Sequence, residues 1–229
     1  MKKILETLEN KWAEYLLEMI VIVMGILVAF TLNNWNDSRK DKLKEIELLV
    51  ELKENLTEDI NNFKESVDWQ NIRIGKLTKA IIQLESSMPN LDTLLYNIRG
   101  TGYFERYEIN SSAYETLKNS GFENISSKQL KKKITHYYDV ETKHMSFIVE
   151  RLNNEQRNSI EQYKWKERQT YDGDPEKFTL YIATKGRFYI NYLQARIEWK
   201  KNFIDDMCIP TINQAEKLIE EIDKELRVK

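Results

Sequence analysis

Residues 18–36 read Glu18-Met19-Ile20-Val21-Ile22-Val23-Met24-Gly25-Ile26-Leu27-Val28-Ala29-Phe30-Thr31-Leu32-Asn33-Asn34-Trp35-Asn36, an apolar run that ends abruptly in polar residues. From Tyr15 to Leu32 the only charged residue is Glu18. A helix of this length, at about 1.5 Å per residue, nearly matches the ~30 Å hydrocarbon core of a bilayer. The sequence therefore predicts a transmembrane helix over residues 15–35.

A buried core helix and a signal peptide are the two alternatives for this run. The flanks favour a span, because Trp12, Tyr15 and Trp35 stand where aromatic anchors lie at the two membrane interfaces. A cleaved signal is disfavoured, since the preceding polar segment is long and Ala29-Phe30-Thr31 offers no pair of small residues for cleavage. We expect the segment to stay as an anchor.

Three residues inside the span are candidate functional residues. Glu18 lies one turn inside the apolar run; it is either a side chain that reaches the headgroups or a carboxylate that handles ions or pairs with a partner. Gly25 and Ala29 form a small-xxx-small pair on one helix face, which allows two helices to approach closely. This pair predicts self-association in the membrane.

The composition is typical of a helical protein with few turns. Of 229 residues 31% are charged, whereas only seven are glycine and three are proline. The net charge of −2, with both signs interspersed, gives no basic face for nucleic acid. The single cysteine, Cys208, excludes an internal disulfide. We expect residues 1–14 to form an amphipathic segment and residues 36–229 a helical bundle domain.

The helix that follows the span carries a heptad pattern from Ile46 to Leu84. Ten of its twelve a and d residues are apolar; the exceptions are Lys53 and Gln70. The pattern fits a parallel two-stranded coil, in which such a polar residue fixes the register, or the first helix of an intramolecular bundle. Further apolar residues widen the stripe and favour the bundle, namely Leu43, Val50, Leu52, Trp69 and Ile72.

Turn-forming residues divide the rest of the chain into further helices. The first long helix is expected to end within residues 86–90, and short helices to follow over residues 91–98 and from a capping box at Ser112 to Leu117. A second box at Ser126 predicts a long helix.

This second long helix is expected to run to about Lys166. Asp174, as N-cap, and Pro175, as the first helical residue, predict the start of a third long helix. Pro210 should kink or restart that helix before a final amphipathic one. The predicted fold is all-α: a transmembrane helix that continues into a long helix of an antiparallel bundle.

Enzymatic constellations are nearly absent from the sequence. There is no glycine-rich phosphate loop, no nucleophile elbow and no cysteine pair. His136 and His144 lie on one predicted helix. A metal site there could use His136, Asp139 and one further ligand, but ordinary histidines at the edge of a bundle are the simpler explanation. We expect no enzymatic activity, no cofactor and no metal.

Tyrosines are plentiful on the second and third long helices. They are Tyr137, Tyr138, Tyr163, Tyr181, Tyr189 and Tyr192. Such amphipathic aromatics either line a small-ligand pocket between helices or pack in the core, and packing is the simpler interpretation.

The segment from Glu18 to Ala29, followed by Asn33-Asn34-Trp35-Asn36, resembles the N-terminal signature of a family of uncharacterised bacterial single-pass membrane proteins. Residues 52–56 and 112–121 resemble the family's first long helix and an internal motif. The resemblance implies an inner-membrane protein of Gram-negative type, and it does not indicate any particular biochemical activity. The basic residues on the two sides of the span nearly balance, and we expect an extracytoplasmic (periplasmic) bundle.

The leading functional hypothesis is a membrane-anchored bundle that acts through protein contacts, as a homo-oligomer or an accessory subunit of a membrane complex. The alternatives are a bundle that binds a small ligand as a sensor, and a subunit of an ion-conducting assembly that uses Glu18.

Overall fold

The computed structural model describes residues 2–98, 107–120, 122, 125–171, 174, 176–177, 181, 183 and 186–228. All regular secondary structure in these ranges is helical, and none of it is a strand. The predicted all-α class is therefore confirmed.

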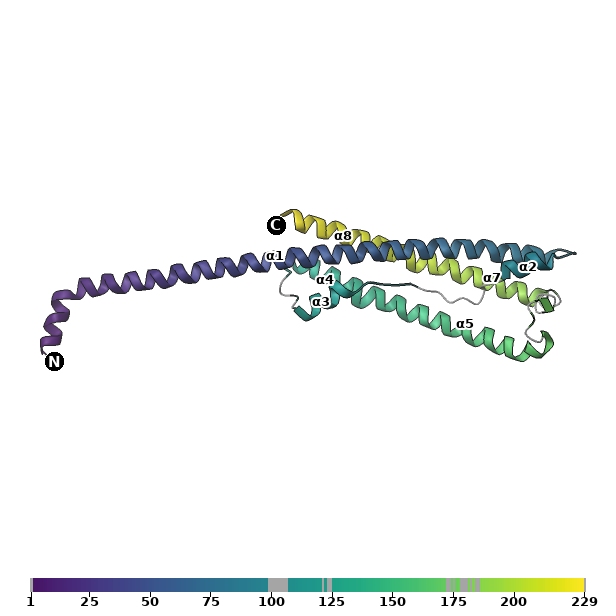
Figure 1. Cartoon of the computed structure of the whole chain (residues 1–229), viewed down its shortest axis with the longest axis horizontal. Helices are drawn as coiled ribbons and strands as arrows, with labels where there is room; N and C mark the ends of the chain where they lie inside the picture. The colour runs from purple at the N-terminus through teal and green to yellow at the C-terminus, as the bar shows by residue number, and fades with distance from the viewer. Residues whose placement is uncertain are drawn as a thin grey trace.

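Helix α1 (Lys2–Glu85) is one uninterrupted helix of 84 residues, roughly 125 Å long. Figure 1 shows its first turns bent away from the remainder, which then runs as a rod far beyond the other helices. The side chains of residues 12–44 are all exposed, and burial begins at Glu45. The apolar run and the first helix of the bundle are thus a single element, as the sequence predicts.

The other elements return along the second half of α1. They are α2 (Leu91–Ile98), α3 (Ser112–Ser120), α4 (Lys128–His136), the π-helical turn η2 (Tyr137–Glu141), α5 (Thr142–Tyr171), α7 (Arg187–Asn202), the π-helical turn η3 (Phe203–Cys208) and α8 (Ile209–Val228). Helices α7 and α8 follow each other through η3 and run antiparallel to α1, so that the C-terminus lies beside the point where the bundle begins (Figure 1).

The core follows α1 in three clusters of buried apolar side chains. The cluster next to the apolar run joins α1 to α3, α4, η2 and α8, with Leu49, Leu56 and Ile134 fully buried. A middle cluster packs Phe63 against Met145 of α5 and the η3 turn. The cluster at the far end joins α1 to α2 and α7. The long heptad helix is therefore the first helix of an intramolecular bundle.

The buried face of α1 keeps most of the d positions of the predicted heptad but only one of its a positions, Ile60. The d residues Leu49, Leu56 and Leu77 are buried, whereas the a residues Ile46 and Ile74 are only half-buried. Most of the positions four residues before a d residue are buried in their place, among them Glu45, Leu52 and Asp59. Glu45 accepts hydrogen bonds from Ser126, and Asp59 accepts them from Asn110 and Tyr137.

Four of the five apolar residues that favoured the bundle in the sequence are exposed. Leu52 alone is buried; the exposed ones are Leu43, Val50, Trp69 and Ile72. The prediction of an intramolecular bundle is correct, but these four residues do not pack in its core.

Helix starts and ends follow the sequence with some shifts. Helix α1 ends at Glu85 and α3 begins at Ser112, as predicted. The N-cap of α4 is Ser127, whose Oγ accepts a hydrogen bond from the N–H of Leu130, and not Ser126, which instead bonds Glu45 of α1. The second long helix runs to Tyr171 and contains η2, which the sequence pattern does not reveal.

The structure tests the predicted helix start at Asp174 and Pro175 only in part. Asp174 accepts a hydrogen bond from the N–H of Glu176, as a cap does, and Glu176 and Lys177 are helical, whereas Pro175 lies outside the described residues. Helix α7 begins at Arg187, after Gly186 with φ of 48°. The helix does not restart at Pro210. The preceding η3 turn widens the hydrogen-bond ladder, so that a residue without an N–H fits into the continuing helix.

Candidate functional site

The residues predicted to act in the membrane all lie on the exposed part of α1. Trp12, Tyr15 and Trp35 are exposed, and so are Glu18, Gly25 and Ala29. A Cβ added at Gly25 would meet no atom within 4 Å. No other described element covers this part of α1, which therefore offers its whole circumference to lipid or to another chain.

One helix of the described chain, α1, is long and apolar enough to cross a membrane, and none of its most apolar window is buried. This excludes a core helix of the bundle as the explanation of the run. A membrane span and a signal sequence are the explanations that fit a helix of this kind near the N-terminus.

The two polar heptad residues find partners within the same chain. The Nζ of Lys53 lies 2.6 Å from Asp223 Oδ1 on α8, and the buried Gln70 accepts a hydrogen bond of 3.0 Å from Lys200 Nζ on α7. Both contacts fix the register of α1 against the returning helices. Neither residue is therefore needed for pairing with a second chain.

A buried carboxylate, Asp59, ties α1 to two other segments. Its Oδ1 accepts a hydrogen bond of 2.6 Å from the N–H of Asn110, and its Oδ2 accepts one of 3.2 Å from Tyr137 of η2. Burial raises the pKa of Asp59 to about 6, against the lowering effect of these two hydrogen bonds. Asn110 also donates to Glu58, so that α1 holds the residues just before α3 by two adjacent carboxylates.

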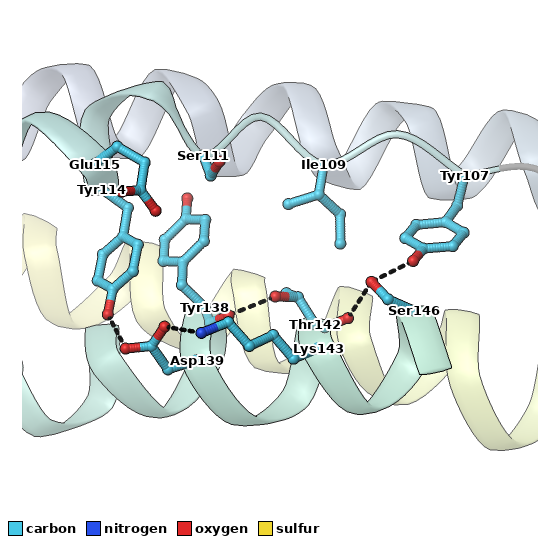
Figure 2. A pocket seen from close by; sticks show the side chains of 10 residues that line it. All are labelled: Tyr107, Ile109, Ser111, Tyr114, Glu115, Tyr138, Asp139, Thr142, Lys143 and Ser146. Atoms are coloured by element: carbon cyan, nitrogen blue, oxygen red, sulfur yellow. Dashed lines mark hydrogen bonds and ion pairs between the residues drawn. The ribbon is translucent and has the colours of Figure 1, made fainter. Parts of the chain in front are cut away.

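An open groove of about 350 Å³ lies beside this network, between the segment that leads into α3 and the η2–α5 helix. Figure 2 shows its lining of aromatic, hydroxyl and charged side chains. Tyr114 donates a hydrogen bond of 2.6 Å to Asp139, whose other oxygen accepts from Lys143. These contacts lower the pKa of Asp139 to about 2, the hydrogen bond from Lys143 contributing most. At the far end Tyr107 bonds Ser146.

The floor of the groove holds a buried hydroxyl, that of Tyr138. The side chain is 3% exposed, its ring stacks on Tyr114 at 4.6 Å between centroids, and its hydroxyl has no hydrogen-bond partner among the described residues. Burial, and to a lesser extent the charge of Asp59, raise its pKa, so that the hydroxyl is protonated and able to donate. In Figure 2 this hydroxyl points toward the segment that carries Ser111.

The structure does not bring the proposed metal ligands together. His136 contacts Glu141 at 2.8 Å, while Asp139 faces Lys143 and Tyr114. Among the described residues no group of three or more histidine, cysteine or acidic side chains is arranged to hold a metal.

Core packing is the simpler interpretation of the six tyrosines and a pocket is the alternative; Tyr137 is buried in the core, and Tyr138, also in that core cluster, lines the groove. Tyr189 and Tyr192 lie in or against the core at the far end, and the side chain of Tyr163 is outside the described residues. Sequence reasoning missed Tyr107 and Tyr114, although Tyr107 belongs to an aromatic segment that stands out between the helices.

These features define a class: an all-helical protein in which one helix carries an exposed apolar segment and then becomes the central helix of a bundle. The chain belongs to a family of unknown function (DUF6090), whose model matches residues 18–171. The matched region contains the apolar segment, Asp59 and the groove, and it ends before α7. No curated protein and no solved structure matches the chain.

Proposed function

We propose that this chain is a single-pass protein of a bacterial inner membrane, which holds an extracytoplasmic bundle and acts through contacts with other protein chains. Its role is that of a self-associating scaffold or an accessory subunit, without catalysis of its own. The observation that carries the proposal is the continuity of α1 from the exposed apolar segment into the centre of the bundle.

Continuity matters because any assembly formed by the membrane segments fixes the positions of the bundles. No flexible linker separates the two parts: residues 36–44 are helical and exposed, and they contain no glycine or proline. In such a chain, the position and orientation of the membrane segment set the position and orientation of the bundle.

The first test asks whether the apolar segment is an anchor or a cleaved signal. The intact mass of the protein from the membrane fraction should include residues 1–35, and alkaline carbonate should not extract it. A mature chain that lacks these residues, or release by carbonate, would contradict the anchor.

The second test measures the mass of the detergent-solubilised full-length protein together with anything that co-purifies. A defined oligomer or a stoichiometric partner subunit is expected. Replacing Gly25 and Ala29 by leucine should reduce assembly if the small pair is a contact, because larger side chains separate the helices. Val23→Leu, on another face of the same helix, is the matched control. A monomer without partners would refute the proposal.

The groove supports a second candidate function, the binding of a small polar ligand, because the buried Tyr138 hydroxyl lacks a partner among the described residues. A ligand with an acceptor atom would satisfy it while its body contacts the tyrosine rings. In a thermal-shift screen of metabolites, a true ligand should stabilise the wild type and lose much of its effect in Tyr138→Phe. Tyr192→Phe removes another buried hydroxyl at the far end of the bundle and should not change the response.

A further inference from the structure

One face of α1 just outside the apolar run is apolar and uncovered. Leu43 is 57% exposed and Val50 41% exposed, and Ile46 between them is half-exposed. At about 100° per residue Leu43 points roughly opposite to Leu52, which lies in the core. The bundle therefore packs on one side of α1 and leaves the opposite side open for another chain.

This face continues into the membrane segment without a break in spacing. Steps of four and three residues, repeated from Glu18 to Val50, select a set that we name the α1 seam. The α1 seam consists of Glu18, Ile22, Gly25, Ala29, Leu32, Asn36, Arg39, Leu43, Ile46 and Val50. Seven of these ten residues are apolar, and all lie in the uninterrupted helix α1. The pattern is the heptad of a coiled coil, shifted to the face that the bundle does not use.

We propose that the α1 seam binds the α1 seam of a second copy of this chain, in parallel and in register. The proposal rests on the self-association proposed above and names its contact surface. Two copies inserted in one membrane point in the same direction, so that their seams run parallel and each residue meets its own equivalent. A period of seven residues in a straight helix drifts by about 20° per heptad, which a left-handed supercoil absorbs.

Side chains beside the seam favour this occupant. In a parallel two-stranded coil the residue just before an a position of one helix lies beside the residue of the partner helix whose number is five higher. In the seam the a positions include Asn36 and Leu43. Lys42 then faces Glu47 of the second copy, and Trp35 faces Lys40, an ion pair and a cation–π contact that two-fold symmetry makes twice. All four side chains are exposed in the single chain and accessible to a second one.

The polar members of the seam fit the same arrangement. Asn36 occupies the kind of position at which a buried asparagine specifies a parallel dimer in fixed register. Arg39 lies near the lipid headgroups, where its stem follows apolar neighbours while the guanidinium reaches water. The seam ends at Val50, because the next residues at the same spacing are Lys53, which pairs with Asp223 of α8, the polar Thr57, and Ile60, which is buried in the core.

Cysteine crosslinking of the full-length chain in membranes tests the seam. The natural Cys208 is fully buried, so that the wild type should give no crosslinked dimer under a mild oxidant. Asn36→Cys and Leu43→Cys place a thiol on the seam. Ser38→Cys and Asp41→Cys, also exposed in the same stretch but on the other side of α1, are the matched controls.

We expect the two seam variants to give several-fold more crosslinked dimer than the two controls. Equal yields at all four positions, or higher yields at the controls, overturn the seam. If the full-length protein is an oligomer by mass but the seam variants do not crosslink, the seam is wrong while the proposed function stands. If it is a monomer without partners and no variant crosslinks, both are wrong.

Charge placed on the seam gives a second readout. Leu43→Glu with Val50→Glu should convert the dimer to a monomer by mass, because each charge would face its equivalent. The circular dichroism spectrum should not change, since neither side chain is part of the core. Ile72→Glu, at an exposed position of α1 beyond the seam, should leave the dimer intact. A dimer that survives the double substitution refutes the proposal.

Discussion

At the scale of single residues, Asp59 joins parts of the chain that are far apart in sequence. It is completely buried and holds Asn110 and Tyr137 by hydrogen bonds. Its carboxyl has a pKa of about 6 in the fold, raised chiefly by burial, against about 3.9 in an unfolded chain. The folded state therefore binds the proton more tightly than the unfolded state does.

A pH dependence of stability follows for Asp59. Its contribution is complete below about pH 4 and is lost as the pH rises through about 6, which corresponds to about 2 to 3 kcal/mol for a shift of this size. Asp59→Asn stays neutral, and should therefore gain stability relative to the wild type between about pH 4 and about pH 7.

Urea unfolding of the full-length protein and of Asp59→Asn, at about pH 4 and about pH 7, checks this prediction. The quantity to compare is the difference in unfolding free energy between the two proteins at each pH. Asp139 does not interfere, because its pKa is lowered to about 2 and its contribution changes only in a more acidic range. A difference that does not vary with pH would mean that Asp59 is not protonated in the fold.

At the scale of elements, α1 and α7 are held together in part by a polar contact. Lys200 is buried and donates to the buried Gln70. Gln70→Leu removes an acceptor from a buried ammonium group, and we expect a loss of about 1.5 to 3 kcal/mol of unfolding free energy.

The double variant Gln70→Leu with Lys200→Met removes both polar groups and should recover much of that loss. Urea midpoints of the single and double variants provide the measurement. If the double variant is as unstable as the sum of the two single variants, the two side chains are not coupled.

The elements show where sequence reasoning succeeds and where it stops. The apolar run, the end of α1 at Glu85 and the start of α3 are readable, because periodicity and turn-forming residues mark them locally. The buried face of α1 is not readable in the same way. Asp59 is polar, and its burial depends on Asn110 and Tyr137, which no local pattern connects to it.

The groove and the open face of α1 are harder still. Tyr107, Tyr114 and Tyr138 lie in different segments, and only the packing of η2 against the residues before α3 brings them together. Leu43 and Val50 suggest core residues by composition, whereas the structure places them opposite the core. An apolar residue in a helix predicts that other side chains or lipid cover it, but the sequence does not show whether those side chains belong to the same chain or to another one.

At the scale of the whole molecule, the proposed membrane anchor implies that the orientation of the chain decides which compartment the bundle occupies. The turn at residues 86–90 lies at the end of α1 farthest from the apolar segment, and Ser87 is exposed there (Figure 1). If the bundle is extracytoplasmic, a membrane-impermeant maleimide should label Ser87→Cys in cells whose inner membrane is intact. The buried Cys208 should keep the wild type unlabelled.

Detergent-permeabilised cells provide the control, since the variant should react there in either orientation. Labelling that requires permeabilisation of the inner membrane would place the bundle in the cytoplasm. The anchor would still hold in that case, and the expected side of the membrane would be wrong.

The unbroken length of α1 also sets a reach. From Leu32 at the end of the apolar run to Glu85 the helix rises roughly 80 Å, and the other described helices lie alongside it. The continuous helix therefore holds the turn at residues 86–90 at a nearly fixed distance from the end of the apolar run. If the apolar segment is the proposed membrane anchor, this turn can meet only molecules within about 80 Å of the bilayer surface. A tilt of the anchor would sweep that turn through an arc, so that small changes of angle in the membrane become large displacements at the tip.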